Sequence, residues 1–198
     1  MLRHGFKTQA ERIAAEARRL VGLPARSPLS ARALAKRLEV VVVGPLDIPD
    51  FPEHLASQML VQHADRWSGF TFKAGEKRFI VHNTTHEPPR QESNIMHEVS
   101  HIWLKHKPDT IEPAGRLPFA MRGFNVDQED EAKWLGGCLQ IPREALLWFL
   151  QRRFDNVAIA AHFNASEEMV RWRRNVTGID AQLARAAVYS KSSFQRRR

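Results

Sequence analysis

The sequence predicts an α+β fold, with a small antiparallel sheet packed on a central helix and a helical module behind it. Three observations carry this prediction. β-branched and aromatic runs lie within residues 40–83, and amphipathic helical patterns lie within residues 91–141. Further helical patterns, separated by turn residues, continue to about residue 190.

The first third of the chain predicts two helices and a strand. Residues 10–23 place Ile13, Ala17 and Leu20 on one helical face before Gly22 and Pro24 end the pattern. Ser30 is the expected cap of a second helix. The run VVVV at residues 40–43 is typical of a buried strand.

The next segment predicts a loop followed by more strands. Residues 46–55 contain several prolines and are expected to form a loop, whereas residues 59–67 alternate as a strand does. In residues 69–83 the dipeptide Ala74-Gly75 separates two alternating runs, which predicts a hairpin. We therefore expect about three antiparallel strands before residue 90.

Two strong helices follow, over about 91–106 and 127–141. The stretch between them, residues 107–127, is rich in proline and glycine and is expected to be a long functional loop. Pro142 begins another helix, and Ser166 is the expected cap of a helix in the C-terminal part. We divide the chain into a main domain, a helix-turn-helix-like extension and a basic flexible tail, at residues 1–150, 151–190 and 191–198.

Composition limits the possible classes. The 198 residues are 43% hydrophobic and 26% charged, which is ordinary for a folded domain. No apolar run approaches the ~20 residues that span a bilayer, so we expect no membrane partner. The N-terminus has no secretory pattern, and Cys138 is the single cysteine, so we expect a cytoplasmic protein.

The candidate chemistry lies in HEVSH at residues 97–101. On a helix, His97 and His101 are one turn apart on the same face, where both can bind one zinc ion. Glu98 lies beside them and can take a proton from a water that zinc has acidified. The pattern arises by chance at roughly the few-per-cent level, so it needs support from the rest of the chain.

A catalytic zinc needs a third protein ligand. By chemistry alone the candidates are Glu129, Asp130 and Glu131 at the start of the second strong helix, and the residues do not choose among them. They also suit the helix dipole without any metal. His106 lies about 140° round the helix from His101, so it is not expected to bind the metal. We expect it at the helix C-terminus, where a cation is favoured.

Taken together, NIMHEVSHIWLKH (94–106) and EDEAKWLGGCLQIP (129–142) resemble the ImmA/IrrE family of zinc metallopeptidases. That family has an HExxH helix followed by a helix of the form E-x-x-A-N-x-F-A-A-x-L-L-M-P. The resemblance implies a zincin-like metallopeptidase domain and makes Glu129 the third zinc ligand. Lys133 stands where the family usually has asparagine, which affects the surroundings of the site but not the ligand set.

The resemblance also implies a function. We expect a zinc-dependent endopeptidase with ligands His97, His101 and Glu129 and with Glu98 as the catalytic base. Related proteins act on helix-turn-helix repressors of the XRE type, so such a repressor is the expected protein partner. The alternative is a non-catalytic regulatory or toxin-antitoxin partner-binding protein with a structural or degenerate zinc site.

The charge allows a third possibility. The formal net charge is +8 and the pI is near 10.2, which permits weak non-specific contact with nucleic acid. Arg171, Arg173 and Arg174 could contact phosphate if the C-terminal module read DNA. We favour the other interpretation, in which these arginines form a solvated or substrate-binding surface.

Overall fold

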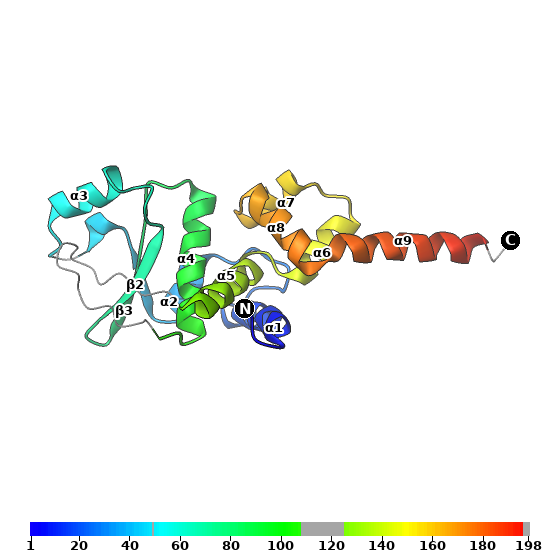
Figure 1. Cartoon of the computed structure of the whole chain (residues 1–198), viewed down its shortest axis with the longest axis horizontal. Coiled ribbons are helices and arrows are strands. Elements are labelled where there is room, and N and C mark those ends of the chain that lie inside the picture. The colour runs from blue at the N-terminus through cyan, green and yellow to red at the C-terminus, as the bar shows by residue number, and fades with distance from the viewer. Residues whose placement is uncertain (49, 108–124, 196–198) are drawn as a thin grey trace.

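The computed structural model describes residues 1–48, 50–107 and 125–195 (Figure 1). The elements are, in order, α1 (Phe6–Leu20), α2 (Ala31–Arg37), β1 (Val40–Val43), a 3-10 turn η1 (Pro45–Asp47), α3 (Glu53–Val61), β2 (Gly69–Ala74), β3 (Lys77–His82), α4 (Pro88–Trp103), α5 (Val126–Gln140), α6 (Arg143–Gln151), α7 (Asn156–Phe163), α8 (Glu167–Thr177) and α9 (Ile179–Gln195). The α+β class is confirmed. The expected long loop at residues 107–127 lies almost wholly outside the described residues.

Side-chain caps begin several of the helices, as the sequence predicted. The Ser30 hydroxyl accepts a hydrogen bond from the Ala33 backbone N–H at 3.4 Å. The Ser166 hydroxyl accepts one from the Met169 N–H at 3.1 Å. These bonds satisfy N–H groups that the first turn of a helix leaves without partners.

The sheet is mixed, which corrects the expectation of an antiparallel sheet. Its order is β1-β3-β2; β2 and β3 form the predicted antiparallel hairpin, but β1 pairs with β3 in parallel. A parallel pair needs a crossover of a dozen or more residues, and residues 44–76, with α3 and β2 among them, supply it. Gly75 closes the hairpin with φ of 57°, a conformation that favours glycine.

Helix α3 corrects two further predictions. It spans the boundary between the expected loop at 46–55 and the expected strand at 59–67. Leu55, Ala56 and Met59 recur at helical spacing across that boundary, and Ala56 is fully buried. The prolines before residue 53 only precede the helix, and the short alternation after it lies in the last turn of the helix and a turn beyond it.

The buried apolar residues form two clusters. The first joins α1, α2, α4 and α5 with Val40 of β1 and Ile80 of β3. The second joins α6, α7 and α8 with Ile141 and Ile179. The change from one cluster to the other therefore falls between Leu139 and Ile141, just after α5 ends.

Two buried arginines hold that junction. Arg18 of α1 donates to the carbonyl of Leu139 at 2.9 Å, and Arg173 of α8 donates to the carbonyl of Ile141 at 2.9 Å. Arg173 also pairs with Glu11 of α1. Burial lowers the pKa of the Arg18 guanidinium to about 10, although Glu11 opposes this shift. The expectation of a solvated arginine surface is therefore wrong for Arg173, which is fully buried.

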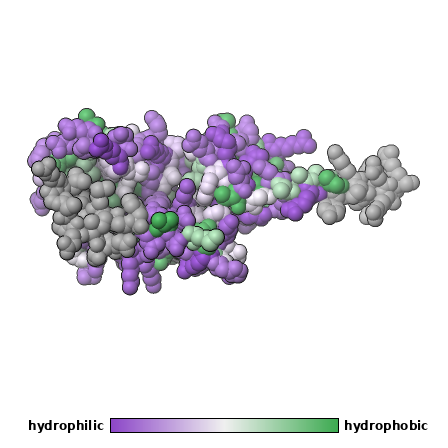
Figure 2. Space-filling view, viewed as in Figure 1, coloured by the Kyte–Doolittle hydropathy of each residue, from purple (hydrophilic) through white to green (hydrophobic). Residues whose placement is uncertain are grey.

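The C-terminal helix extends away from the rest of the molecule (Figure 1). It continues to Gln195, so residues 191–195 are helical and residues 196–198 lie outside the described part. Among the residues that are coloured by hydropathy in Figure 2, hydrophilic ones cover most of the visible surface. Among the described residues, no helix is both long enough and apolar enough to span a bilayer.

Candidate metal centre

Helix α4 presents the HEVSH residues beside its buried face. Ile95, Met96 and Val99 lie in the first cluster and anchor one side of the helix. His97 and His101 are four residues apart, so their side chains leave the helix one turn apart on the same side. Their ring centroids lie 4.7 Å apart at an interplanar angle of 77°.

Helix α5 brings Glu129 to these histidines. The Asn125 side chain accepts hydrogen bonds from the backbone N–H groups of Asp127 and Gln128 and begins the helix, which puts Glu129 in its first turn. Two turns later Gly136 faces α4, and a Cβ atom there would lie only 3.6 Å from the Cα atom of His97. Gly136 thus lies where the two helices pack against each other, and this packing brings their side chains together.

The three predicted ligands converge. The Nε2 atoms of His97 and His101 are 3.1 Å apart. Glu129 places Oε2 at 3.1 Å from the first and Oε1 at 3.0 Å from the second. Among the described residues, these three form the one group of histidine, cysteine and acidic side chains whose ligand atoms all lie within 4.8 Å of one another.

This arrangement fits a zinc ion. Tetrahedral bonds of about 2.0–2.1 Å hold the bonded atoms roughly 3.3 Å apart, close to the 3.0–3.1 Å seen here. Both imidazole nitrogens face the same carboxylate and each other, and lone pairs that converge on one point suit a bound cation. Two histidines with one carboxylate are also the donor set of known catalytic zinc sites.

Glu98, the residue after His97, contacts strand β2. Its carboxylate Oε2 accepts a hydrogen bond from the Thr71 hydroxyl of β2 at 2.7 Å, and its side chain is buried, with 6% of the residue exposed. Gly69 of the same strand lies close to this side chain, since a Cβ atom there would lie 3.4 Å from the Cγ atom of Glu98. Sequence reasoning missed Thr71, since nothing local links a residue on β2 to α4.

His106 is the other residue whose place was not foreseen. Its Nδ1 atom lies 3.0 Å from Nδ1 of His101, and its Nε2 atom lies 3.3 Å from Oε2 of Glu131. The helical-wheel prediction placed His106 about 140° from His101 because it assumed that the helix continues. The chain instead turns back at Lys105, which has φ of 55°. The left-handed conformation of Lys105 therefore determines where His106 lies, and the sequence does not indicate that conformation.

The three acidic candidates therefore have different surroundings. Glu129 faces the histidines, whereas Glu131 contacts His106 and the guanidinium of Arg3. Asp130 is half exposed and lies 3.3 Å from the N-terminal ammonium group. Only Glu129 shares the group of three ligand atoms.

His82 and His86, which also have i,i+4 spacing, make separate contacts. His82 Nε2 lies 2.7 Å from a guanidinium nitrogen of Arg32, and His86 Nδ1 lies 2.9 Å from the amide of Asn94. Burial, with help from Arg32, lowers the pKa of His82. Burial also lowers the pKa of His86. Neither belongs to a metal-binding group among the residues that the structure describes.

Comparison with known families gives an independent result. The sequence model of Peptidase M78, described as the IrrE N-terminal-like domain, matches residues 54–175. The chain belongs to this family. The match extends from α3 to α8, so it includes both metal-centre helices and most of the C-terminal module. No match was found among curated proteins.

Membership in the family confirms the resemblance to ImmA/IrrE proteins and points to a metallopeptidase. The family match and the geometry are separate observations that agree. One concerns the sequence over 122 positions, from 54 to 175, and the other concerns the convergence of three side chains.

Proposed function

We propose that this protein is a zinc-dependent endopeptidase whose metal is held by His97, His101 and Glu129. The observation that carries the proposal is the convergence of these ligand atoms beside a buried glutamate, in a chain of a peptidase family. Zinc is the metal we assign because two imidazoles and one carboxylate suit it. A catalytic zinc ion with three protein ligands keeps its fourth position for water or substrate, and we assign that role to this site.

Each residue has a definite task in this proposal. Zinc bound there would acidify a water molecule and polarise the carbonyl of the scissile peptide bond. Glu98 accepts the proton that the attacking water loses and passes it to the leaving nitrogen. Thr71 donates a hydrogen bond to one carboxylate oxygen of Glu98 and so fixes the direction of the other.

We propose a helix-turn-helix repressor of the XRE type as the protein substrate, because the family resemblance implies it. The formal charge of +8 supports weak contact with nucleic acid, through which the enzyme could meet a repressor still bound to DNA. Such contact would weaken as salt concentration rises. The single cysteine, which forms no disulfide, supports action in the reducing cytoplasm.

The test combines metal analysis with one substitution. Purified protein is expected to contain one zinc ion. Glu98→Gln is expected to keep this ion while losing at least ~100-fold in cleavage of an XRE-type repressor supplied as the substrate. Glu87→Gln, at the exposed start of the same helix, is the matched control and should keep full activity. Normal cleavage by Glu98→Gln would contradict the mechanism.

A further inference from the structure

The chain makes a sharp turn just after the HEVSH helix. Lys105 is left-handed, and the backbone N–H of His106 donates to the carbonyl of His101 at 3.0 Å, while the N–H of Lys105 donates to that of Ile102 at 3.1 Å. These two bonds define a Schellman ending of the helix. The turn folds the imidazole of His106 back over that of His101, with ring centroids 5.0 Å apart.

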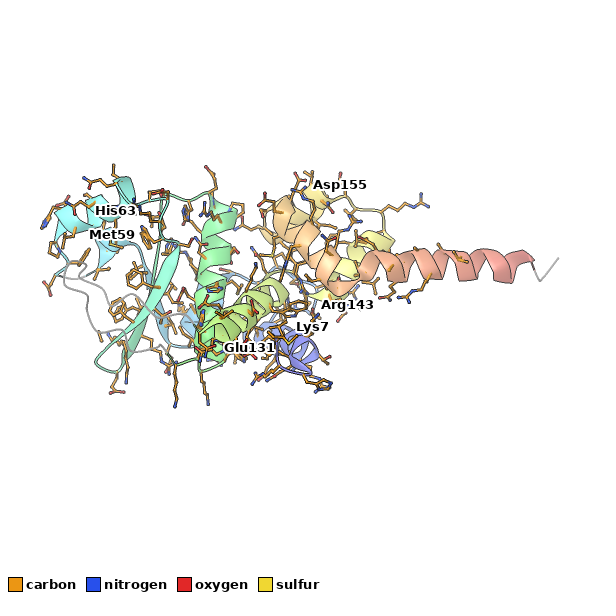
Figure 3. The ribbon with its side chains drawn as sticks, in the orientation of Figure 1. Lys7, Met59, His63, Glu131, Arg143 and Asp155 are labelled. Carbon is orange, nitrogen blue, oxygen red and sulfur yellow. The ribbon has the colours of Figure 1, made fainter. Side chains whose placement is uncertain are left out.

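A chain of polar contacts continues from there. His101 contacts His106 through their Nδ1 atoms at 3.0 Å, and His106 contacts Oε2 of Glu131 at 3.3 Å. The other oxygen of Glu131 lies 2.9 Å from Nε of Arg3. Glu131 lies where α5 meets the lower end of α4 (Figure 3). The side chains of His106 and Glu131 are only 8% and 12% exposed, so water competes little for these contacts.

The direction of the protons follows from the two ends of this chain. The guanidinium of Arg3 can only donate, and an ionised carboxylate can only accept. Nε2 of His106 must therefore carry the proton shared with Glu131, which leaves its Nδ1 atom as an acceptor when the ring is neutral. His101 must then donate from Nδ1, so its Nε2 atom keeps a lone pair facing His97 and Glu129.

We propose that His106, Glu131 and Arg3 are positioning residues that fix the ring orientation and tautomer of His101 for metal binding. This inference rests on the metal site proposed above. It extends that site to residues outside the group of three candidate ligand residues. Hydrogen bonds of this kind to the second ring nitrogen of a ligand histidine commonly change metal affinity 10–100-fold.

The experiment measures zinc affinity of the full chain by competition with a chromophoric chelator. His106→Phe keeps a ring of similar size but removes the acceptor, and we expect it to weaken zinc binding about 10–100-fold. Asp130→Asn changes the half-exposed acid next to Glu131 and should bind zinc as the parent does. Unfolding of each metal-free protein shows whether a variant has simply lost its structure.

A second pair of variants tests the proton direction. In Glu131→Gln the amide oxygen should face Arg3, so its NH2 group would face His106. The direction of donation along the hydrogen bonds from residue 131 to His101 would then be reversed. We expect weaker zinc binding, similar to that of His106→Phe. Adding Arg3→Ala lets the amide rotate, and we expect part of the affinity to return.

The outcomes separate this inference from the proposed function. If the parent protein binds no zinc, the proposed function fails. If the parent binds zinc and folded His106→Phe binds it equally well, the positioning role is refuted. If adding Arg3→Ala to Glu131→Gln restores none of the zinc affinity, the proposed direction of proton donation from His106 to Glu131 is refuted. Weak binding together with an unfolded metal-free variant would show a structural role and would also overturn the proposal.

Discussion

Two adjacent glycines of α5 face different neighbours, and replacing each by alanine should have opposite effects. At Gly136 a Cβ atom would lie 3.6 Å from its nearest neighbours, the Cα and N atoms of His97, which is ordinary contact. At Gly137 it would lie 2.3 Å from Cζ3 of Trp172 on α8. Trp172 itself packs against Trp134, with ring centroids 5.8 Å apart, so the indole cannot move freely.

The magnitudes follow from these distances. Alanine is favoured over glycine inside a helix by about 1 kcal/mol, and this gain applies at both positions. Gly136→Ala should therefore raise the free energy of unfolding by up to that amount. At Gly137 the indole must shift by more than an ångström, and overpacking of this kind costs about 1–3 kcal/mol. The two variants should thus differ by about 1–3 kcal/mol, with Gly137→Ala the less stable.

Chemical denaturation of both variants under one set of conditions measures this difference. In thermal unfolding, each kcal/mol should move the midpoint by about 2–4 °C for a chain of this size. Trp172→Phe should recover part of the loss in the Gly137→Ala background, because the smaller ring leaves space. The reasoning is refuted if Gly137→Ala proves as stable as Gly136→Ala, since the close approach of the new Cβ atom to Trp172 would then carry no energetic cost.

Two further results are expected. Thr71→Val removes the hydrogen bond to Glu98, and hydrogen bonds to charged groups are worth about 1.5–3 kcal/mol. We therefore expect kcat/KM for peptide cleavage to fall about tenfold or more, while the zinc affinity stays unchanged. Thr71→Ser keeps the hydroxyl and should stay close to the parent, so equal losses in both variants would contradict the role. Burial lowers the pKa of His82 in the folded state, so the unfolded chain binds that proton more tightly and stability should fall as pH drops below about 6.5. His82→Gln should show a shallower loss of unfolding free energy between roughly pH 7 and pH 5, and an unchanged slope would exclude His82 as the cause.

The elements that the sequence predicted well depend on local signals. The caps at Ser30 and Ser166 and the hairpin turn at Gly75 each involve residues only a few positions apart. The parallel pairing of β1 depends on contacts between residues far apart in the chain, such as Val41 with Phe79, and no local pattern encodes it. Helix α3 was missed because its apolar spacing was divided between two shorter windows.

In the candidate site, too, the sequence predicted what local spacing determines and missed what depends on contacts between distant residues. The spacing of His97 and His101 lies within one helix, so the sequence alone placed their side chains together. Selection of Glu129 over its acidic neighbours needed the resemblance to a family, because only the packing of two helices decides which carboxylate faces the histidines. The position of His106 depends on the left-handed backbone conformation of Lys105, which the presence of a lysine does not predict.

Helix α5 connects the metal centre to the C-terminal module. Its first turn carries Glu129, one of its contacts with α4 is at Gly136, and Trp172 of α8 packs against the next residue, Gly137. Arg173 then holds the carbonyl of Ile141, just beyond the end of the helix. The two adjacent glycines therefore face different partners, Gly136 facing α4 and Gly137 facing α8. The proposed third ligand and the contact with the C-terminal module therefore lie on the same helix, although no described side chain of the module belongs to the group of three candidate ligand residues.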